Sequence, residues 1–351
     1  MYNGRMTNIK ALYRQYRPHT FDDVIGQDHV VRVLKGMLSK KEFGHAYLFN
    51  GSRGIGKTTL ARIFAKELGC APEDIYEIDG ASHRKIEDIR DLRDGVRTLP
   101  FSSPYKVYII DEVHMLTREA FNAFLKTLEE PPQHVIFMLA TTEPEKIPDT
   151  IISRCQVFQL KKPTMSDVVQ NLKRVLEAEK FSIDEGGLQL IAMLARGSFR
   201  DGLGILQKVL SISTDAHIDQ AEIEMVLGVP SFEYIKEALQ GLADHDDEAV
   251  FSTLVRLSSE SQDVALFVER LLHILRMIFI ARYTPGQRSA LQATASEDQW
   301  SLVESLIGED GKTLNAGTLA RLLQAQREMK YASLPVVPLE LAFMELLGQN
   351  T

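Results

Sequence analysis

The stretch "GSRGIGKT" (residues 51–58) decides the fold of this chain. It matches the pattern G-x-x-x-x-G-K-[ST] at every fixed position. The apolar run "HAYLF" (45–49) precedes it and a helical pattern over residues 57–68 follows, which is the strand–loop–helix setting that the pattern requires. Glycines let such a loop turn tightly, so that backbone amides and the helix N-terminus point at phosphate oxygens. The stretch therefore predicts a phosphate-binding loop in an α/β domain.

The side chains of the loop predict how it binds a nucleotide. Lys57 can neutralise the β- and γ-phosphates, and the Thr58 hydroxyl can bind Mg²⁺. Further nucleotide contacts are expected from Gly51, Ser52, Arg53, Gly54, Ile55, Gly56 and Thr59. The alternative is a glycine-rich turn with a chance lysine, and the strand and helix on either side of the loop argue against it.

Apolar runs and helical patterns alternate from the loop to about residue 160. Further strands are expected at residues 75–78, 106–110, 135–140 and 157–160, with another helix over 117–129. Strands that alternate with helices predict a parallel sheet. After Pro163 helical periodicity takes over and no convincing strand is found, while "GVPSF" (228–232) indicates a break between helical regions. The predicted domains are residues 1–164, an α/β nucleotide-binding domain; residues 165–227, a small helical domain; and residues 228–351, a larger helical domain.

A pair of carboxylates follows one of the expected strands. Asp111 and Glu112 lie in "VYIIDEVHML" (107–116), directly after four apolar residues. Ligands of open α/β sheets bind at the C-terminal edge of the strands. Asp111 is predicted to hold Mg²⁺, and Glu112 to orient and deprotonate the attacking water. Such a pair is by itself usually a helix N-terminal cap, but together with the loop it predicts nucleotide hydrolysis.

Three more polar residues are weaker candidates. "FMLATTEP" (137–144) ends a strand at Thr142, whose hydroxyl could sense the γ-phosphate or belong to an ordinary strand-end turn. Arg154 in "SRC" and Arg200 in "GSFRD" lie near expected helix ends. The residues alone leave both interpretations of Thr142 open, and they do not distinguish the two arginines from ordinary surface residues.

Composition narrows the class of protein. The chain has 351 residues, 44% of them hydrophobic, and a net charge of −8, so nucleic-acid binding would need a local basic surface. The N-terminus has no apolar signal-peptide core. The most apolar run, residues 264–283, carries Glu269 and Arg270 among other charges and is expected to be a core helix, not a membrane span. The two cysteines suit a reducing compartment, so a cytoplasmic location is expected.

A series of segments, taken in order, resembles the gamma/tau subunit family of bacterial DNA polymerase III. They are "YRQYRPHTFDDVIGQDHV" (13–30), the phosphate-binding loop, "EIDGASHRKIEDIRDL" (77–92), "KVYIIDEVHML" (106–116), "FLKTLEEPP" (124–132), "LATTEPEKIPDTIISRC" (139–155) and "GSFRDGL" (197–203). The resemblance is weaker over the helical C-terminal part. It implies an AAA+ P-loop ATPase domain with a parallel sheet, then a small helical lid and an all-α collar.

The resemblance also implies a function and partners. ATP binding and hydrolysis would open a sliding clamp and load it on primer–template DNA, in a pentamer with other clamp-loader subunits of a DNA polymerase III-type holoenzyme. The cofactors would be ATP and Mg²⁺, and no membrane is implied. The chain resembles the shorter gamma form, because nothing in it corresponds to the segments that the longer tau form adds.

Roles for individual residues follow from the resemblance. Arg154 matches the finger that reaches the ATP of a neighbouring subunit, Arg200 matches the lid arginine that contacts the γ-phosphate, and Thr142 matches the sensor. The positions that match adenine contacts are Tyr13, Arg17, Pro18, Val24 and Ile25. The positions that match DNA-backbone contacts are Arg84, Lys85, Arg90, Lys126 and Thr150. From the residues alone, segment 84–91 fits a solvated charged helix as well as a DNA contact, because acidic residues share it.

Cys70 matches the first cysteine of a four-cysteine zinc module in that family. Here the chain runs from Cys70 through "APED" straight into the strand at 75–78, and Cys155 belongs to "SRC". One thiolate cannot hold a structural zinc, so we expect none. Cys70 is interpreted as a remnant or a small semi-buried residue.

Two other functions are kept as alternatives. A Holliday-junction branch-migration motor is another DNA-directed AAA+ ATPase that begins with an "RP…F…IGQ" segment, but such motors usually add a winged-helix domain, whereas this C-terminus predicts helices only. An ATP-inert structural clamp-loader subunit would lack the loop lysine or the acidic pair, and Lys57, Asp111 and Glu112 are all present.

Overall fold

The computed structural model describes residues 11–83, 86–213, 215–308 and 313–348. The chain divides into two compact units. The first contains the chain up to Val175 together with Ala192–Gln207, and the second contains Leu176–Ile191 together with the chain from Lys208 onward. Each unit has its own hydrophobic core. The three-domain division expected from the sequence stays a prediction.

The first unit is built on a parallel sheet whose five strands, within the described residues, follow the order β2-β3-β4-β1-β5. The strands are β1 (Ala46–Asn50), β2 (Ile75–Asp79), β3 (Lys106–Asp111), β4 (Val135–Thr141) and β5 (Gln156–Gln159). Near-continuous apolar runs form β1, β3 and β4, because both faces of the sheet are buried there. The edge strands β2 and β5 include polar residues and are partly exposed. The strands predicted from the sequence are confirmed, each to within one residue at either end.

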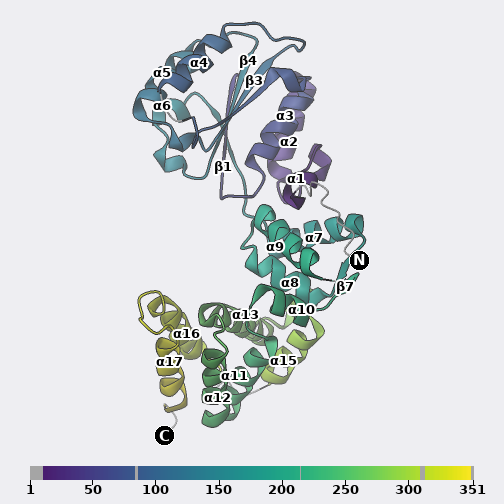
Figure 1. The fold of residues 1–351 in the computed structure, drawn as a ribbon, viewed down its shortest axis with the longest axis vertical. Helices are drawn as coiled ribbons and strands as arrows, with labels where there is room; N and C mark the ends of the chain where they lie inside the picture. Colours follow the sequence, from purple (N-terminus) through teal and green to yellow (C-terminus); the bar gives the residue numbers. More distant parts are fainter. Residues whose placement is uncertain (1–10, 84–85, 214, 309–312, 349–351) are drawn as a thin grey trace, which may run out of the picture. The chain divides into compact units, whose positions relative to one another are not determined.

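Helices cover both faces of this sheet (Figure 1). The helices of this part of the chain are α1 (Leu12–Gln15), α2 (Asp28–Lys40), α3 (Lys57–Glu67), α4 (Ile86–Val96), α5 (Arg118–Glu129) and α6 (Asp149–Ile152), with 3₁₀ turns η1 (Phe21–Asp23), η2 (Pro72–Asp74), η3 (Val113–Met115) and η4 (Pro144–Lys146). Phe49 of β1 packs on the face covered by α2 and α3, whereas Leu48 packs on the face covered by α4, α5 and α6. Because successive side chains of a strand point to opposite faces, both faces of the sheet are buried. The C-terminal edge of the strands is left for a ligand.

The connection between α3 and β2 is short and holds the loop before β3. Cys70 is buried, and burial raises the pKa of its thiol to about 11. Asp74, at the end of η2, accepts hydrogen bonds from the backbone amides of Phe101, Ser102 and Ser103 at 2.5, 2.9 and 2.9 Å. A carboxylate therefore anchors the loop at the place where the family resemblance would put a zinc module.

Residues of α7 (Met165–Glu179), α8 (Glu185–Leu194) and α9 (Phe199–Ile212) belong partly to each unit. The second unit also contains a pair of parallel two-residue strands, β6 (Ser182–Ile183) and β7 (His217–Ile218). The prediction that no strand follows Pro163 is wrong here. Two residues are too short to show an alternating pattern, so only the pairing with a distant segment reveals them.

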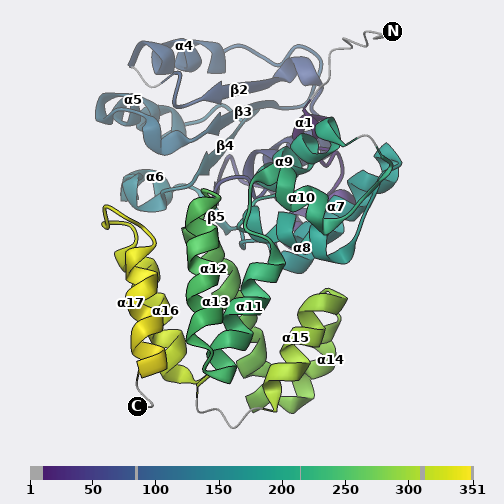
Figure 2. The same cartoon turned by 60° about the horizontal axis from the view of Figure 1, so that its bottom comes forward.

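The rest of the second unit is helical. Its elements are α10 (Gln220–Leu227), α11 (Phe232–Asp244), α12 (Asp247–Ser259), α13 (Val264–Tyr283), η5 (Pro285–Gln287), α14 (Arg288–Gln292), α15 (Glu297–Ile307), α16 (Ala316–Glu328) and α17 (Val337–Gly348). The helix break predicted at 228–232 is confirmed. The predicted core helix is α13, which packs against α11, α15 and α16 (Figure 2). In the described part of the chain no helix is long and apolar enough to cross a membrane.

Candidate active site

The phosphate-binding loop joins β1 to α3 at the C-terminal edge of the sheet. Gly54 and Gly56 have φ angles of 75° and 106°, in the left-handed region that favours glycine. A Cβ at Gly54 would lie 2.1 Å from the Oγ of Ser198, so the close approach of these two segments also requires glycine. The local sequence therefore shapes the loop as the motif predicts.

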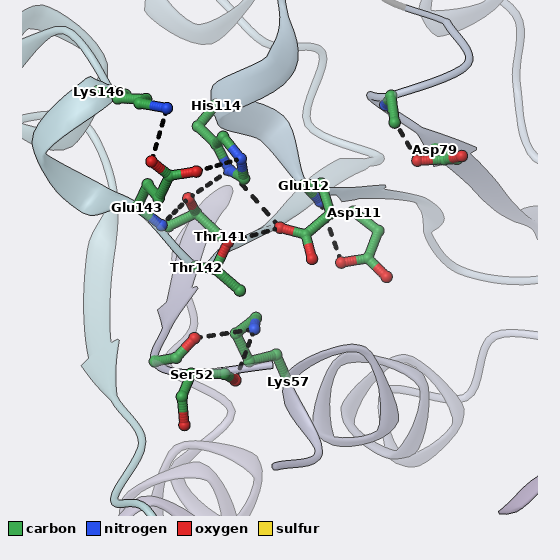
Figure 3. A network of polar contacts seen from close by, with 12 residues as sticks. Ser52, Lys57, Asp79, Asp111, Glu112, His114, Thr141, Thr142, Glu143 and Lys146 are labelled. Carbon is green, nitrogen blue, oxygen red and sulfur yellow. Dashed lines mark hydrogen bonds and ion pairs between the residues drawn. The ribbon is translucent and has the colours of Figure 1, made fainter. Parts of the chain in front are cut away.

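Lys57 is the first residue of α3, and its side chain is buried. Its Nζ donates to the carbonyl oxygens of Gly51 and Ser52, both at 2.9 Å (Figure 3). Burial lowers the pKa of this ammonium group, and the nearby carboxylates of Glu112 and Asp111 oppose the shift. Because Lys57 forms no ion pair with any described residue, its buried charge is available to an anionic ligand.

The residues predicted for metal, base and sensor lie close together. The Oγ1 of Thr58 donates to Oδ2 of Asp111 at 2.7 Å, which places a hydroxyl beside a carboxylate at the end of β3. Both are oxygen ligands of the kind that Mg²⁺ prefers. The Oγ1 of Thr142 donates to Oε2 of Glu112 at 3.1 Å (Figure 3). The carboxylate predicted to be the base is thus held beside the hydroxyl predicted to be the sensor.

Arg200 approaches the loop from the start of α9. Its backbone N–H donates to the carbonyl oxygen of Gly54 at 3.4 Å, and its guanidinium carbon lies 5.8 Å from the ring centroid of Tyr13. Arg200, Tyr13 and Lys57 line the same cavity. The structure therefore brings this arginine to the phosphate-binding loop, although the two are far apart in the sequence.

The cavity has a volume of about 710 Å³, and the predicted adenine contacts line one part of it: Tyr13, Arg17, Pro18, Val24 and Ile25. The Nε of Arg17 donates to Oγ1 of Thr59 at 3.0 Å, and burial and the nearby Arg62 lower its pKa to about 10. Lining residues that sequence reasoning missed include Asn171, Phe199 and Leu203. A partly apolar cavity with a few polar groups suits a small organic ligand such as a nucleotide.

Arg154 does not line this cavity. Its guanidinium donates to Oε1 of Glu129 and to the carbonyl oxygen of Thr150, both at 2.7 Å, and its side chain is 36% exposed. A finger that acts on a neighbouring subunit must lie outside the cavity of its own chain. The position of Arg154 fits this requirement, and its role stays a prediction.

The predicted DNA contacts are only partly placed. Lys126 is exposed on α5 and Thr150 is exposed on α6. Arg84 and Lys85 lie outside the described residues, and so does the side chain of Arg90. Their DNA-binding role stays a prediction.

Sequence reasoning missed a polar network beside the base. His114, Glu143 and Lys146 continue outward from Glu112 along the end of β4 (Figure 3). His114 lies in "VYIIDEVHML", three residues after Asp111, so its position in the motif was a visible signal. The direction of its side chain could not be read from the sequence, because the backbone turns sharply at Glu112 (φ 47°).

Both metal predictions stay predictions. Thr58 and Asp111 offer two oxygen ligands, which fits Mg²⁺ because this ion usually takes its other ligands from phosphates and water. No group of three or more His, Cys, Asp or Glu side chains in the described residues could hold a metal ion. The absence of zinc stays a prediction.

The fold and the site define an AAA+ P-loop nucleotide-binding protein. The Thermotoga maritima RuvB Holliday junction branch migration motor has the same fold, with a TM-score of 0.52 and 24% identity over 65% of this chain and 79% of that one. Another RuvB structure from the same organism matches with a TM-score of 0.53 and 22% identity over 83% of this chain and 90% of that one. At these identities the likeness concerns the fold alone.

Sequence comparison identifies the family. The model for the DNA polymerase III delta subunit matches residues 26–83 and 72–164, and the model for the DNA polymerase III clamp loader subunit ATPase lid domain matches residues 167–214. DNA polymerase III subunit gamma of Buchnera aphidicola subsp. Acyrthosiphon pisum is 33% identical over 97% of this chain and 99% of its own length. The chain belongs to the gamma/tau family of DNA polymerase III subunits.

Some relatives are longer than this chain. DNA polymerase III subunit tau of Bacillus subtilis is 38% identical over 97% of this chain, which spans 63% of the tau subunit. The Escherichia coli tau subunit is 37% identical over 80% of this chain, which spans 46% of that protein.

Proposed function

We propose that this chain is the ATPase motor subunit of a sliding-clamp loader. It would couple ATP binding and hydrolysis to the opening of a clamp and its loading on primer–template DNA during replication. The observation that carries the proposal is the convergence of Lys57, the Thr58–Asp111 pair and Glu112 in a chain of the gamma/tau family. An ATP-inert structural subunit would not need these four side chains at one site.

The geometry supports a division of roles in hydrolysis. Lys57 and Arg200 would bind and neutralise the phosphates, while Thr142 and Glu112 would orient the attacking water. Glu112 would accept a proton from that water as the water oxygen bonds to the γ-phosphorus, while the bond from the γ-phosphorus to the β–γ bridging oxygen breaks and ADP leaves. Mg²⁺ held by Thr58 and Asp111 would neutralise charge on the β- and γ-phosphate oxygens.

The proposed partners are other clamp-loader subunits in a pentamer, the clamp, and primer–template DNA. Arg154 would reach the ATP of a neighbouring subunit and stabilise transition-state charge there. The exposed Lys126 and Thr150 would follow the DNA backbone together with Arg84, Lys85 and Arg90. Contacts of this kind bind DNA independently of sequence and weaken with salt. The proposed location is cytoplasmic, which the absence of a membrane-spanning helix from the described residues allows.

A branch-migration motor remains the second candidate, because RuvB shares the fold. The family membership favours the clamp loader, since a gamma subunit aligns with 97% of this chain, including its helical C-terminal part. Branch-migration motors usually place a DNA-binding domain in that part, whereas the second unit here is almost entirely helical.

The decisive experiment measures ATP hydrolysis by the chain combined with its partner subunits. Rates are compared without additions, with clamp alone, with primed DNA alone and with both. We expect the largest rate with clamp and primed DNA together, and little effect of blunt duplex. A rate of ATP hydrolysis that is unchanged by the clamp but rises with four-way junction DNA would favour the branch-migration motor and overturn the proposal.

A further inference from the structure

His114 lies on the side of Glu112 that faces away from the phosphate-binding loop (Figure 3). It belongs to η3, the 3₁₀ turn that follows β3. Glu112 has a left-handed backbone conformation with φ of 47°, which turns the chain sharply and carries His114 towards the end of β4. The His114 side chain is only 5% exposed. A polar ring buried to this degree needs hydrogen-bond partners.

The ring of His114 has polar groups at both nitrogens. Its Nδ1 lies 3.0 Å from Oγ1 of Thr141 and 3.5 Å from Oε2 of Glu112. Its Nε2 lies 3.2 Å from Oε1 of Glu143. The imidazole therefore stands between two carboxylates. The Oε2 atom of Glu112 that it faces is the same atom that accepts the hydrogen bond from Thr142.

The outer carboxylate is itself held in place. Lys146 donates to Oε2 of Glu143 at 2.6 Å, and the backbone N–H of Glu143 donates to Oγ1 of Thr141 at 3.0 Å. The hydrogen bond from Lys146 is the main reason why the pKa of Glu143 lies below its usual range, so this group is anionic at neutral pH. Glu143 is thus a fixed negative partner for the buried ring.

We propose that His114 is a positioning residue for Glu112. Anchored by Glu143 and Thr141, the ring holds the Glu112 carboxylate beside Thr142, where both side chains can reach one water molecule. The inference rests on the proposed ATP hydrolysis and adds a residue that does not line the nucleotide cavity and acts through Glu112. A general base must lie within hydrogen-bond reach of the proton it takes, and an error of about 1 Å in a reacting group can cost about a hundredfold in rate.

The test compares His114→Ala with His114→Asn in the assembled complex. We expect His114→Ala to lower the maximal rate of ATP hydrolysis about tenfold to a hundredfold, with an unchanged dissociation constant for a fluorescent ATP analogue. His114→Asn should recover part of the rate, because its side-chain amide can replace Nδ1 beside Glu112 and Thr141. A residue that only fills the core would shift the melting temperature without this separation of binding from rate.

His134→Ala is the matched control. His134 also lies in the first unit and its ring contacts the backbone carbonyl oxygens of Val96 and Thr98, so its loss removes a histidine without touching Glu112. Glu143→Gln tests the same link from the outer side and should lower the rate of ATP hydrolysis less than His114→Ala does. This variant keeps the inference testable if His114→Ala does not fold. Normal rates for both His114→Ala and Glu143→Gln beside an active parent complex would overturn only this inference. A parent complex without ATPase activity would overturn the proposed function as well.

Discussion

Lys57 shows at the scale of one residue why the site favours an anion. The ammonium group is buried and its hydrogen bonds go to two backbone carbonyl oxygens of the loop. Backbone carbonyls satisfy its protons but do not neutralise its charge. A phosphate that replaces them gains a charge-assisted hydrogen bond in a water-poor setting.

Replacing Lys57 with Ala should therefore abolish tight nucleotide binding. Loss of hydrogen bonds to a charged group is worth about 1.5–3 kcal/mol, which weakens affinity by about tenfold to a hundredfold or more. Titration with a fluorescent ATP analogue measures the change. Lys126→Ala, which removes an exposed lysine of the same unit, is the control that should bind normally. Equal affinities for the two variants would contradict the assignment.

Asp74 illustrates how one carboxylate shapes a loop. Burial acts to raise its pKa, but hydrogen bonds from Phe101, Ser102 and Ser103 outweigh it, and the pKa falls to about 2. A carboxyl whose pKa is lower in the folded state stabilises that state above its unfolded pKa of about 4. This contribution to the stability of the folded state is lost as the pH falls from about 4 through about 2.

Asp74→Asn should lower the stability of the first unit by an amount that depends on pH. The amide keeps the shape but loses the charge that the three backbone N–H groups bind. We expect the difference in urea midpoint between parent and variant to be constant from pH 8 to pH 5 and to shrink below about pH 4. A difference that grows on acidification would contradict the role of the anion.

The sequence pattern predicted which residues form the site better than it predicted where their side chains point. Lys57, Asp111 and Glu112 were predictable because motif spacing alone places them at the C-terminal edge of the sheet. The pairing of His114 with Glu143 was not, because it depends on the backbone turn at Glu112 and on the neighbouring strand. The contact of Arg17 with Thr59 was equally hidden, since the two residues meet only in the folded unit.

At the scale of elements, α6 and the residues after it present Arg154 at the surface. The arginine is held by Glu129 at the end of α5 and by the carbonyl oxygen of Thr150 in α6. These two contacts orient the guanidinium at the tip of the side chain. The side chain is 36% exposed, which on the proposed role would leave it accessible to a neighbouring subunit.

Arg154→Ala should keep nucleotide binding and lose hydrolysis stimulated by DNA in the assembled complex. An arginine finger contributes about 10³- to 10⁵-fold to the rate, so the stimulated rate should fall to near the background. Glu129→Ala is the matched control, because it removes the same ion pair but leaves the guanidinium in place. Normal turnover by the Arg154 variant would contradict the finger assignment, as would an equal loss in both variants.

Elements were predictable where apolar residues recur over several positions. The strands β1, β3 and β4 are largely apolar runs, and α13 is an apolar stretch of 20 residues with interspersed charges. In contrast, β6 and β7 are two residues each and exist only through their pairing. Local patterns carry no signal for a contact between segments more than 30 residues apart in the sequence.

At the scale of the whole molecule, the second unit contains a buried ion pair of its own. Arg270 on α13 donates to Oε1 of Glu224 on α10 at 2.7 Å, and both side chains are more than 90% buried. Arg270 also donates to the carbonyl oxygen of Pro230. The pair ties α10 and the break at 228–232 to the central helix. Removing one partner of such a pair leaves an uncompensated charge.

Arg270→Met should destabilise the second unit by about 3–5 kcal/mol. Hydrogen exchange of the amides in α10 and α13 measures the change locally, which avoids treating a chain of two units as a single unfolding transition. The double variant Arg270→Met, Glu224→Leu should recover most of the loss, because no charge remains buried alone. Equal exchange rates in the parent and the single variant would contradict the prediction.

The pairing of Arg154 with Glu129 has a consequence for the stability of its own subunit. An exposed ion pair contributes about 0–1 kcal/mol, so releasing Arg154 from Glu129 would cost the chain little stability. On the proposed role, the arginine would then be free to move from Glu129 to the phosphate of a neighbouring ATP. Its effect on the turnover rate would thus come with almost no effect on the folding of its own subunit.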